Sequence, residues 1–280
     1  MYTYAHAPLR RSCLAISYTF RTEKSIFRRK RRHFSLYSAP FYAAFRTAGR
    51  KRSKAVAFCC KRVYTGRMKI ASPKLPEQLQ PLAAEEAETL LAAEERVYGA
   101  CLAGGQPLRF PNAAFACTRF SSCSFTAALL KGADFADCVF DRCDFSGADF
   151  AGASFRRAEF CECKGVGADL SESSVSDAVF DKCNFSYANL SHAKLRDVRA
   201  ASCDFSYADL DGCALRNFET DKTRFVRTNF FGTQLKGVDL SSCTLAGLTL
   251  SAQLTEIRGA TLSRLQCADF LRALGVNIKD

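Results

Sequence analysis

The sequence predicts an all-β solenoid, in which the chain winds into stacked coils made of short extended edges. The prediction depends on a five-residue repeat that keeps one frame from residue 110 to residue 250. Of the 29 positions divisible by five in this range, 15 are Phe and ten are Leu. The position two residues earlier is small, since 11 of its 28 occurrences are Ala and eight are Cys. The residue just before the large one is often Asp or Asn, whose side chains suit corners because they hydrogen-bond the local backbone.

A period of five matches neither a helix nor a simple strand, which repeat every 3.6 and every two residues. It fits a chain that makes a short edge, turns a corner and repeats. One large and one small residue of each five then point inward and fill a narrow interior by close packing. The other three residues face water.

The repeat resembles the pentapeptide-repeat family, and the likeness covers about half of the chain. The resemblance implies a right-handed quadrilateral parallel β-helix with four repeats in each coil. Residues 20 apart then stack on one face, and 28 repeats make about seven coils. We expect the β-helix to span residues 108–262 and to carry short helical caps at both ends.

Residues 1–67 differ from the rest in charge. They hold 17 Lys and Arg and a single acid, Glu23, whereas residues 68–280 hold 23 bases and 27 acids. Such a charge density does not support a packed core, so we expect disorder. Three interpretations stay open: a basic tail that binds nucleic acid or anionic lipid, an organelle transit peptide, or a true start at Met68 that leaves the segment outside the working protein.

The two ends of the repeat carry helical patterns. Residues 68–107 are expected to form an N-terminal cap, because apolar side chains between residues 76 and 97 fall at helical spacing. After Leu250 the frame slips, with a last repeat displaced by two residues. Ser263 can then cap a helix within the tail, residues 263–280. The apolar stripe of this helix either covers the last coil or forms a dimer: Leu265, Phe270, Leu271 and Leu274.

The stacking of every fourth repeat also predicts what each column contains. Phe218 is expected to point inward, because Thr220 beside it leaves room. Gly165 replaces a core Phe, which predicts a small void or a bend. One column consists of cysteines, which we interpret as buried small hydrophobic residues, because a straight row does not converge on a metal ion. They are Cys123, Cys143, Cys163, Cys183, Cys203 and Cys243.

One face stands out by its charge, and we call it the acidic face. Between Ala148 and Gly232 its five pentapeptides contain neither Lys nor Arg. A stack of like charges on a rigid rod costs self-repulsion, which a cationic partner surface would relieve. The competing interpretation is that an acid before the large residue belongs to the repeat pattern itself. The acids are Asp149, Asp169, Glu172, Asp209 and Asp211.

The sequence carries no phosphate-binding loop, nucleophile elbow or metal-ligand spacing, so we expect neither an enzyme nor a cofactor or metal site. It predicts a non-enzymatic protein that binds a protein partner through faces of the β-helix. No apolar run is long enough to span a membrane and no secretory signal is visible, so we expect a cytoplasmic protein with reduced thiols.

The C-terminal tail is similar to that of the quinolone-resistance branch of the family. This resemblance implies a DNA mimic that binds a type II topoisomerase, DNA gyrase or topoisomerase IV, and a homodimer formed through the C-terminal helix. Two features depart from that branch: the unbroken frame leaves no room for the loops of its Gram-negative members, and the net negative charge of the repeats is small. Nucleic-acid binding through the basic N-terminus is a further alternative.

Overall fold

The computed structural model describes residues 68–93, 96–104, 111–273 and 276–277, so the predictions for residues 1–67 lie outside the described residues. The strands and helices are, in chain order, β1 (Gln80–Pro81), α2 (Ala84–Ala92), β2 (Val97–Tyr98), β3 (Ala100–Ala103), β4 (Ala114–Ala116), β5 (Arg119–Ser121), β6 (Asp134–Asp141), β7 (Ser154–Cys161), β8 (Ser174–Asp181), β9 (Lys194–Ala201), β10 (Ala214–Asp221), β11 (Arg224–Val226), β12 (Thr244–Ala246) and α3 (Arg264–Ala273).

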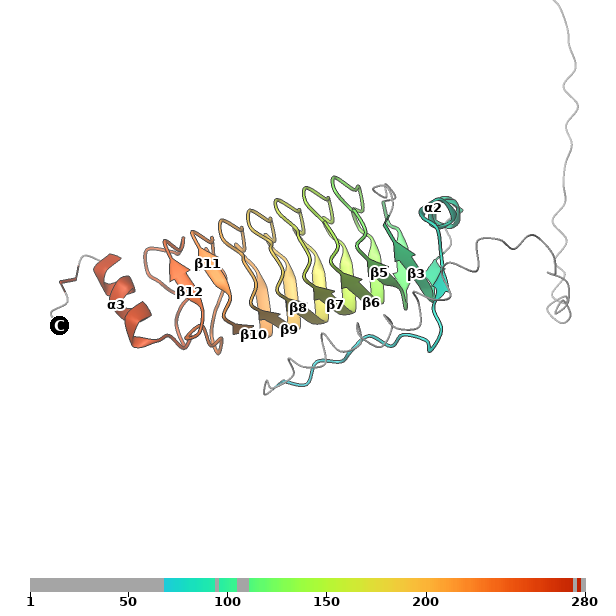
Figure 1. Ribbon diagram of the computed structural model, residues 1–280. Coiled ribbons are helices and arrows are strands. Elements are labelled where there is room, and N and C mark those ends of the chain that lie inside the picture. Colours follow the sequence, from blue (N-terminus) through green and yellow to red (C-terminus); the bar gives the residue numbers. More distant parts are fainter. Residues whose placement is uncertain (1–67, 94–95, 105–110, 274–275, 278–280) are drawn as a thin grey trace, which may run out of the picture. The chain divides into compact units, whose positions relative to one another are not determined.

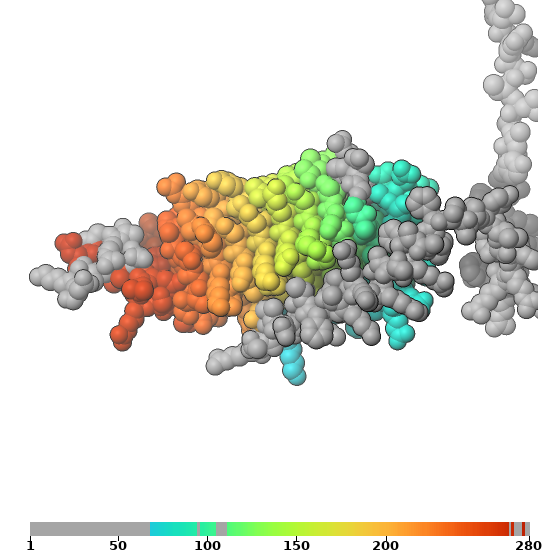
Figure 2. Space-filling model, in the orientation of Figure 1, coloured from blue at the N-terminus to red at the C-terminus, as the bar shows by residue number. Residues whose placement is uncertain are grey.

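The strands build a right-handed parallel β-helix of about eight turns. Figure 1 shows the coils as an unbroken stack between β3 and β12, and in Figure 2 they form successive bands from green to orange. Each of β6 to β9 pairs in parallel with the next strand at an offset of one coil, for example Phe135 with Phe155. The predicted stacking of residues 20 apart is therefore confirmed.

Four sides make up each coil. Each eight-residue strand from β6 to β10 covers two sides and bends between them. The other two sides pair through single bridges, such as Asp144 with Lys164 and Asp149 with Asp169. Backbone N–H groups donate along the axis of the rod, as from Phe125 to the carbonyl oxygen of Asp144 at 2.7 Å.

The chain turns its corners at the residue two places after each large one. These corner residues have positive φ, for example 57° at Asp137, 53° at Glu162 and 59° at His192. Side chains other than glycine seldom adopt this left-handed conformation, because Cβ crowds the backbone. The ladder of hydrogen bonds above and below therefore fixes a backbone that single residues would avoid.

Phenylalanine rings fill the interior in stacked columns. The rings of Phe135 and Phe155 lie 4.9 Å apart and 4° from parallel, and those of Phe160 and Phe180 lie 4.5 Å apart. Phe218 is buried with 7% of its surface exposed, which confirms that it points inward. The large residue of each repeat therefore packs in the interior of the β-helix, as the sequence predicts.

Threonine and cysteine side chains at the small inward position donate to carbonyl oxygens of the preceding coil. The hydroxyl of Thr228 donates to the carbonyl oxygen of Phe205 at 2.8 Å, and the hydroxyl of Thr223 donates to that of Ala200 at 3.1 Å. The thiol of Cys183 makes the same contact with the carbonyl oxygen of Phe160 at 3.4 Å. Ala, Cys and Thr can therefore share this buried position, because the hydroxyl or thiol finds an acceptor there.

The sequence predicts a small void or a bend at Gly165. A Cβ atom placed on Gly165 would lie 2.4 Å from a ring carbon of Phe185, one coil further on, so this ring takes part of the space that the missing side chain leaves. A cavity of about 10 Å³ remains nearby, lined by side chains that include Phe145, Phe160 and Phe185. A close-packed interior relaxes in this way when a neighbouring ring can move.

Parallel pairing starts before the expected boundary at residue 108. Strands β2 and β3 pair with β4 and β5, as between Val97 and Phe115, at a smaller offset than that of the later coils. This shorter coil breaks the frame of five, which hid it from the repeat count and adds a turn to the seven expected. Helix α2 lies beside this first coil and buries Ala87 and Leu91 against the core.

The C-terminal end begins with the predicted slip, because Asp239 pairs with Thr261, whereas the frame of the earlier coils would pair it with Gly259. The buried carboxylate of Glu256 organises the extra residues by accepting the N–H of Gly232 at 3.0 Å and the hydroxyl hydrogen of Ser251 at 2.8 Å. Helix α3 then starts at its N-cap Ser263, whose hydroxyl oxygen accepts the N–H of Gln266 at 3.3 Å.

Candidate functional site

The acidic face is a continuous surface in the structure. Its Asp and Asn residues pair coil to coil in one column of parallel bridges: Leu129, Asp149, Asp169, Asn189, Asp209, Asn229 and Thr249. The four aspartates of the predicted set are partly exposed, and Glu172 is exposed at a corner with φ of 55°. The structure therefore brings all five acids to one side of the rod.

Part of this arrangement is structural. One carboxylate oxygen of Asp149 accepts the N–H of Ala151 at 3.0 Å, and one of Asp169 accepts the N–H of Ser171 at 2.9 Å. The same contact occurs in other columns, as between Asp144 and the N–H of Ser146 at 2.9 Å. An acid before the large residue thus tightens the turn wherever it occurs.

The charge of the acidic face is nevertheless particular to it. Asp169 accepts a hydrogen bond from the side-chain amide of Asn189 at 3.1 Å, and Asp209 accepts one from that of Asn229 at 2.5 Å. The stacking partner of Asp169 and of Asp209 is here a neutral amide, which satisfies a carboxylate oxygen and leaves the charge in place, whereas Asp149 stacks on Asp169 itself.

The neighbouring column, which runs from Ser124 to Arg224, pairs its acids differently. Asp144 lies 3.7 Å from the ammonium of Lys164, and Asp204 lies 3.6 Å from the guanidinium of Arg224. Both columns use the same turn, yet one sets its acids beside bases, whereas the other sets them beside amides or beside another acid. The repeat pattern alone therefore does not account for the acidic face.

His192 lies beside the acids of this face. Its ring packs over Gly212, and its Nε2 atom lies 3.9 Å from a carboxylate oxygen of Asp211. This pair becomes an ion pair when the imidazole is protonated. The exposed ring thus lies at one edge of the acidic face.

A column of aromatic side chains borders the acidic face, and we call it the aromatic edge. It was not predicted from the sequence. The rings of Tyr187 and Tyr207 stack at 4.7 Å and 5° while 59% and 43% of these residues stay exposed. The guanidinium of Arg227 lies 5.8 Å from the centre of the Tyr207 ring. All three occupy one corner column, so the signal in the sequence is their recurrence at the same place in successive coils.

The cysteine column lies in the interior, as predicted. Its six members are buried, between 1% and 7% exposed: Cys123, Cys143, Cys163, Cys183, Cys203 and Cys243. Burial also raises the pKa of Cys183 well above its ordinary value, which keeps this thiol protonated. Among the described residues, no group of three His, Cys, Asp or Glu side chains is placed to hold a metal ion.

The apolar stripe of α3 does not lie on one buried surface. Leu265 is 81% exposed and Leu271 is 43% exposed, whereas Phe270 is partly buried. Leu274 and Gly275 lie outside the described residues. The contact of α3 with the last coil is made by Gln266, which donates to the carbonyl oxygens of Leu240 at 2.8 Å and Cys243 at 2.7 Å.

The fold and the face define a class of protein, a rigid β-helical repeat protein that displays its outward side chains in columns. Residues 133–210 match the family described as Pentapeptide repeat region, and residues 203–247 match Pentapeptide repeats (8 copies). Residues 133–247 are therefore similar to pentapeptide-repeat proteins. No helix in the described part of the chain is both long and apolar enough to cross a membrane.

Three solved structures illustrate the relatives. HetL, a pentapeptide repeat protein involved in heterocyst differentiation regulation in the cyanobacterium Nostoc, is 17% identical over 68% of this chain and 92% of its own, with a TM-score of 0.41. QnrB1, a plasmid-mediated fluoroquinolone resistance protein, is 20% identical over 72% of this chain and 100% of its own, at 0.30. A pentapeptide repeat protein of the Arabidopsis thaliana thylakoid lumen is 23% identical over 42% and 65%, at 0.18. No protein of curated function matches the sequence.

Proposed function

We propose that this chain is a non-enzymatic interaction protein that binds a cationic surface of a protein partner through the acidic face. One observation carries the proposal: Asp169 and Asp209 stack on asparagine and Asp149 stacks on Asp169, whereas the neighbouring column places Lys or Arg beside its acids. Uncompensated charges on a rigid scaffold repel one another, and a partner that supplies the opposite charge relieves that cost. The cytoplasm is the compartment in which we propose that this binding takes place.

The aromatic edge supports a partner rich in Lys or Arg. Tyrosine rings attract cations to their faces, with Arg usually the better partner. Arg227 already lies beside the ring of Tyr207, so this column accommodates a guanidinium. Tyr187 continues the column alongside Asn189 and Asp169, so a cationic side chain of a partner meets both an aromatic face and a carboxylate there.

Site-specific photo-crosslinking in cells tests this proposal. A photoreactive amino acid replaces His192 on the acidic face or, as a matched control, Lys182 on another corner; both positions are exposed and have φ of 59° and 55°. We expect a discrete protein adduct from position 192 and none of that size from position 182. Substitution of the four aspartates by Asn and of Glu172 by Gln, which keeps the turn-forming acceptors, abolishes the adduct.

The matched charge control is the pair of substitutions Asp144→Asn and Asp204→Asn in the neighbouring column. These also keep the turns but remove acids that already have basic partners, so the adduct from position 192 persists. Equal adducts from both positions, or an adduct insensitive to the neutralised acidic face, contradict the proposal.

A second candidate is a DNA mimic that binds a type II topoisomerase, DNA gyrase or topoisomerase IV. The stacked carboxylates on a rigid rod favour it. The density of charge limits it, because five acids over five coils give one charge per roughly 5 Å, against about 1.7 Å in duplex DNA. The supercoiling activity of purified gyrase, with and without a fluoroquinolone, distinguishes the two candidates. The mimic predicts an effect of the full chain that disappears in the neutralised variant, and no effect at micromolar protein rejects it.

We further propose that α3 forms a homodimer contact through Leu265 and Leu271. Their exposure supports this proposal, because a helix that only covered its own coil would turn these side chains inward. Leu265→Asp is expected to convert a dimer into a monomer in light scattering after size exclusion. The substitution Lys194→Asp, at an exposed position on β9, leaves the mass unchanged. A monomeric unaltered protein rejects the contact.

A further inference from the structure

The segment before β1 lies along the outside of the β-helix, and we call residues 68–76 the strap (Figure 1). Two backbone N–H groups of the strap reach aspartates of the coils. The N–H of Lys74 donates to Asp137 at 2.9 Å, and the N–H of Ala71 donates to Asp177 at 3.4 Å. The contacts are made by the main chain, while Ala71, Ser72 and Lys74 stay exposed.

The aspartates belong to one corner column, in the middle of the strands β6 to β10. Every residue of this column has φ between 51° and 57°, which turns its side chain outward at the same corner of successive coils. The column is acidic, with one base among three acids, and we call it the Asp137 column. Its members are Asp137, Arg157, Asp177, Asp197 and Asn217.

The spacing of the strap matches that of the column. Ala71 and Lys74 are three residues apart, which spans about 10 Å in an extended chain. Asp137 and Asp177 are two coils apart, which is about 9.6 Å at the usual distance between strands. The next step of three residues leads to Met68, and Met68 indeed lines a hollow together with Asn217, two coils beyond Asp177.

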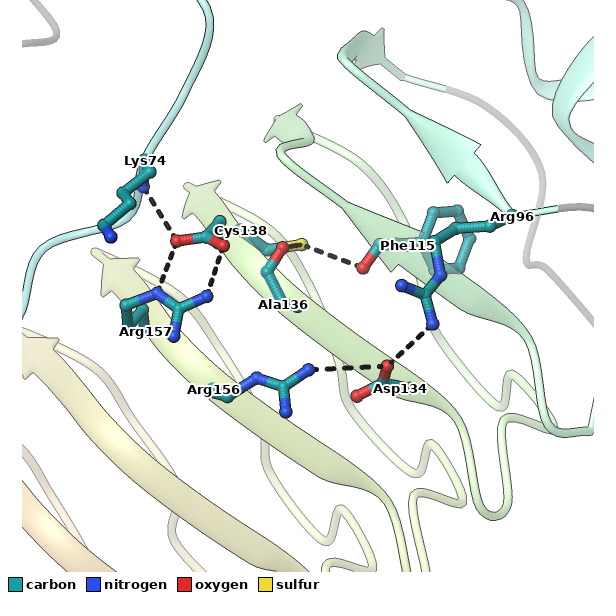
Figure 3. Close-up of polar contacts among 9 residues, drawn as sticks. Lys74, Arg96, Phe115, Asp134, Ala136, Cys138, Arg156 and Arg157 are labelled. Atoms are coloured by element: carbon teal, nitrogen blue, oxygen red, sulfur yellow. Dashed lines mark hydrogen bonds and ion pairs between the residues drawn. The ribbon is translucent and has the colours of Figure 1, made fainter.

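The first aspartate of the column is held in place for its role. Arg157 donates to both carboxylate oxygens of Asp137, from Nε at 2.6 Å and from a terminal nitrogen at 2.5 Å. The N–H of Lys74 donates to the same carboxylate, as a dashed line in Figure 3 shows. A two-point contact of this kind fixes both the charge and the orientation of the acceptor. The exposed side of the carboxylate group is thereby aimed at the strap.

The strap begins at a hollow in the surface of the coils. Met68 lines this hollow together with Asp197, Phe218 and Val238, and its volume is about 590 Å³.

We propose that the Asp137 column is a peptide-binding groove that takes an extended, lysine-bearing segment of a partner protein, with the strap as its competitor in the same chain. The strap shows how a segment binds in this groove. The main-chain N–H groups of Ala71 and Lys74, three residues apart, donate to Asp177 and Asp137, which are two coils apart. Lys69 and Lys74 place positive charge beside the acids. Two main-chain hydrogen bonds hold the strap, and the side chains of Ala71, Ser72 and Lys74 are exposed. Because so few contacts hold it, a partner segment can displace the strap.

The groove is tested in the full chain by removing the two donors with Ala71→Pro and Lys74→Pro, since proline keeps an extended backbone but has no N–H. A fluorescent peptide with the sequence of residues 68–76 is then titrated by anisotropy. We expect about tenfold tighter binding to the proline variant than to the unaltered chain, because the competing strap has been released. Ala71→Ser with Lys74→Ala, which keeps both N–H groups, binds the peptide as weakly as the unaltered chain.

Two further measurements make the outcome decisive. The same peptide carrying the two prolines must not bind, and Asp177→Ala added to the proline variant must weaken binding of the original peptide. In the unaltered chain, hydrogen exchange at Ala71 and Lys74 is expected to be slower than at Ser72 and Leu75. Equal exchange at these four amides, equal binding of both peptides, or no binding of the original peptide to a folded proline variant overturns the proposal.

Discussion

The ring of Phe185 occupies the space above Gly165, so closely that a Cβ atom on the glycine would lie 2.4 Å from it. Gly165 is the point at which a core phenylalanine is missing from its column, between Phe145 and Phe185. The interior therefore compensates across coils: a loss of volume in one coil is partly filled by the large residue of the next.

Gly165→Ala is expected to destabilise the protein by overpacking, at a cost of about 1–3 kcal/mol. The backbone of Gly165 is not left-handed, so the cost arises from the ring and not from φ. Denaturant unfolding measures it. Phe185→Leu in the same chain should recover part of the loss, because the smaller side chain makes room for the methyl group. Additive effects of the two substitutions would contradict this account.

Asp169 separates the role of the turn from that of the charge. Asp169→Ala removes the acceptor for the N–H of Ser171 and for the amide of Asn189, and we expect a loss of about 1–2 kcal/mol. Asp169→Asn keeps an acceptor oxygen and should stay within about 0.5 kcal/mol of the unaltered protein. Thermal unfolding compares the two variants. If both variants are equally destabilised, the negative charge of Asp169 itself stabilises the fold. That result would contradict the proposal that the charge of the acidic face serves to bind a partner.

The pair formed by Asp137 and Arg157 makes stability depend on pH at the acidic end. Hydrogen bonds from Arg157 are the largest cause that lowers the pKa of Asp137 below its ordinary value of 3.8. A carboxylate with a lowered pKa stabilises the folded state fully above the ordinary pKa, and this contribution is lost as the pH falls through the folded-state pKa. Arg157→Gln should therefore cost about 1–2 kcal/mol at neutral pH and progressively less as the pH falls through the folded-state pKa of Asp137.

The adjacent Arg156 provides the control for this prediction. Its guanidinium lies 3.9 Å from Asp134 and is about half exposed, so Arg156→Gln is expected to change stability little at any pH (Figure 3). Thermal unfolding of both variants between about pH 2 and pH 7 gives the comparison. A difference between Arg157→Gln and the unaltered protein that stays constant over this range contradicts the assignment.

Gln266 closes the last coil, so Gln266→Ala should leave the carbonyl oxygens of Leu240 and Cys243 without donors. We expect a loss of about 1–3 kcal/mol, concentrated at the C-terminal coils. Hydrogen exchange between residues 240 and 262 locates the effect. Arg264→Ala, at an exposed position of the same helix, is the control and should change stability by less than about 0.5 kcal/mol. An equal loss in both variants would contradict a specific role of the Gln266 side chain.

Much of the fold could be predicted from the sequence because one side chain in five dominates its energetics. A buried phenylalanine stabilises the structure by about 1.5–3 kcal/mol, and fifteen centres of the frame are Phe. The inward position of Phe218 and the slip after Leu250 followed from the same reasoning, since volume and frame are visible in a single chain.

The features that escaped prediction depend on contacts without a local period. The first coil is shorter than the others, so Val97 and Phe115 pair outside the frame of five. The strap binds through main-chain N–H groups, which leave no trace in residue type. The stacked tyrosines do leave a trace in the sequence, but it becomes visible only when outward positions are compared coil by coil.

The fixed length of the coil also governs how such a chain can change in length. Removal of a whole interior coil, such as residues 171–190, shortens the rod and leaves Asp149 and Asp209 on the same side. Removal of a single pentapeptide between them rotates everything beyond it by a quarter turn, which carries Asp209 round to another side. A chain of this kind can gain or lose complete coils and keep each outward residue on its side of the rod. The gain or loss of one repeat instead moves every later outward residue to a different side.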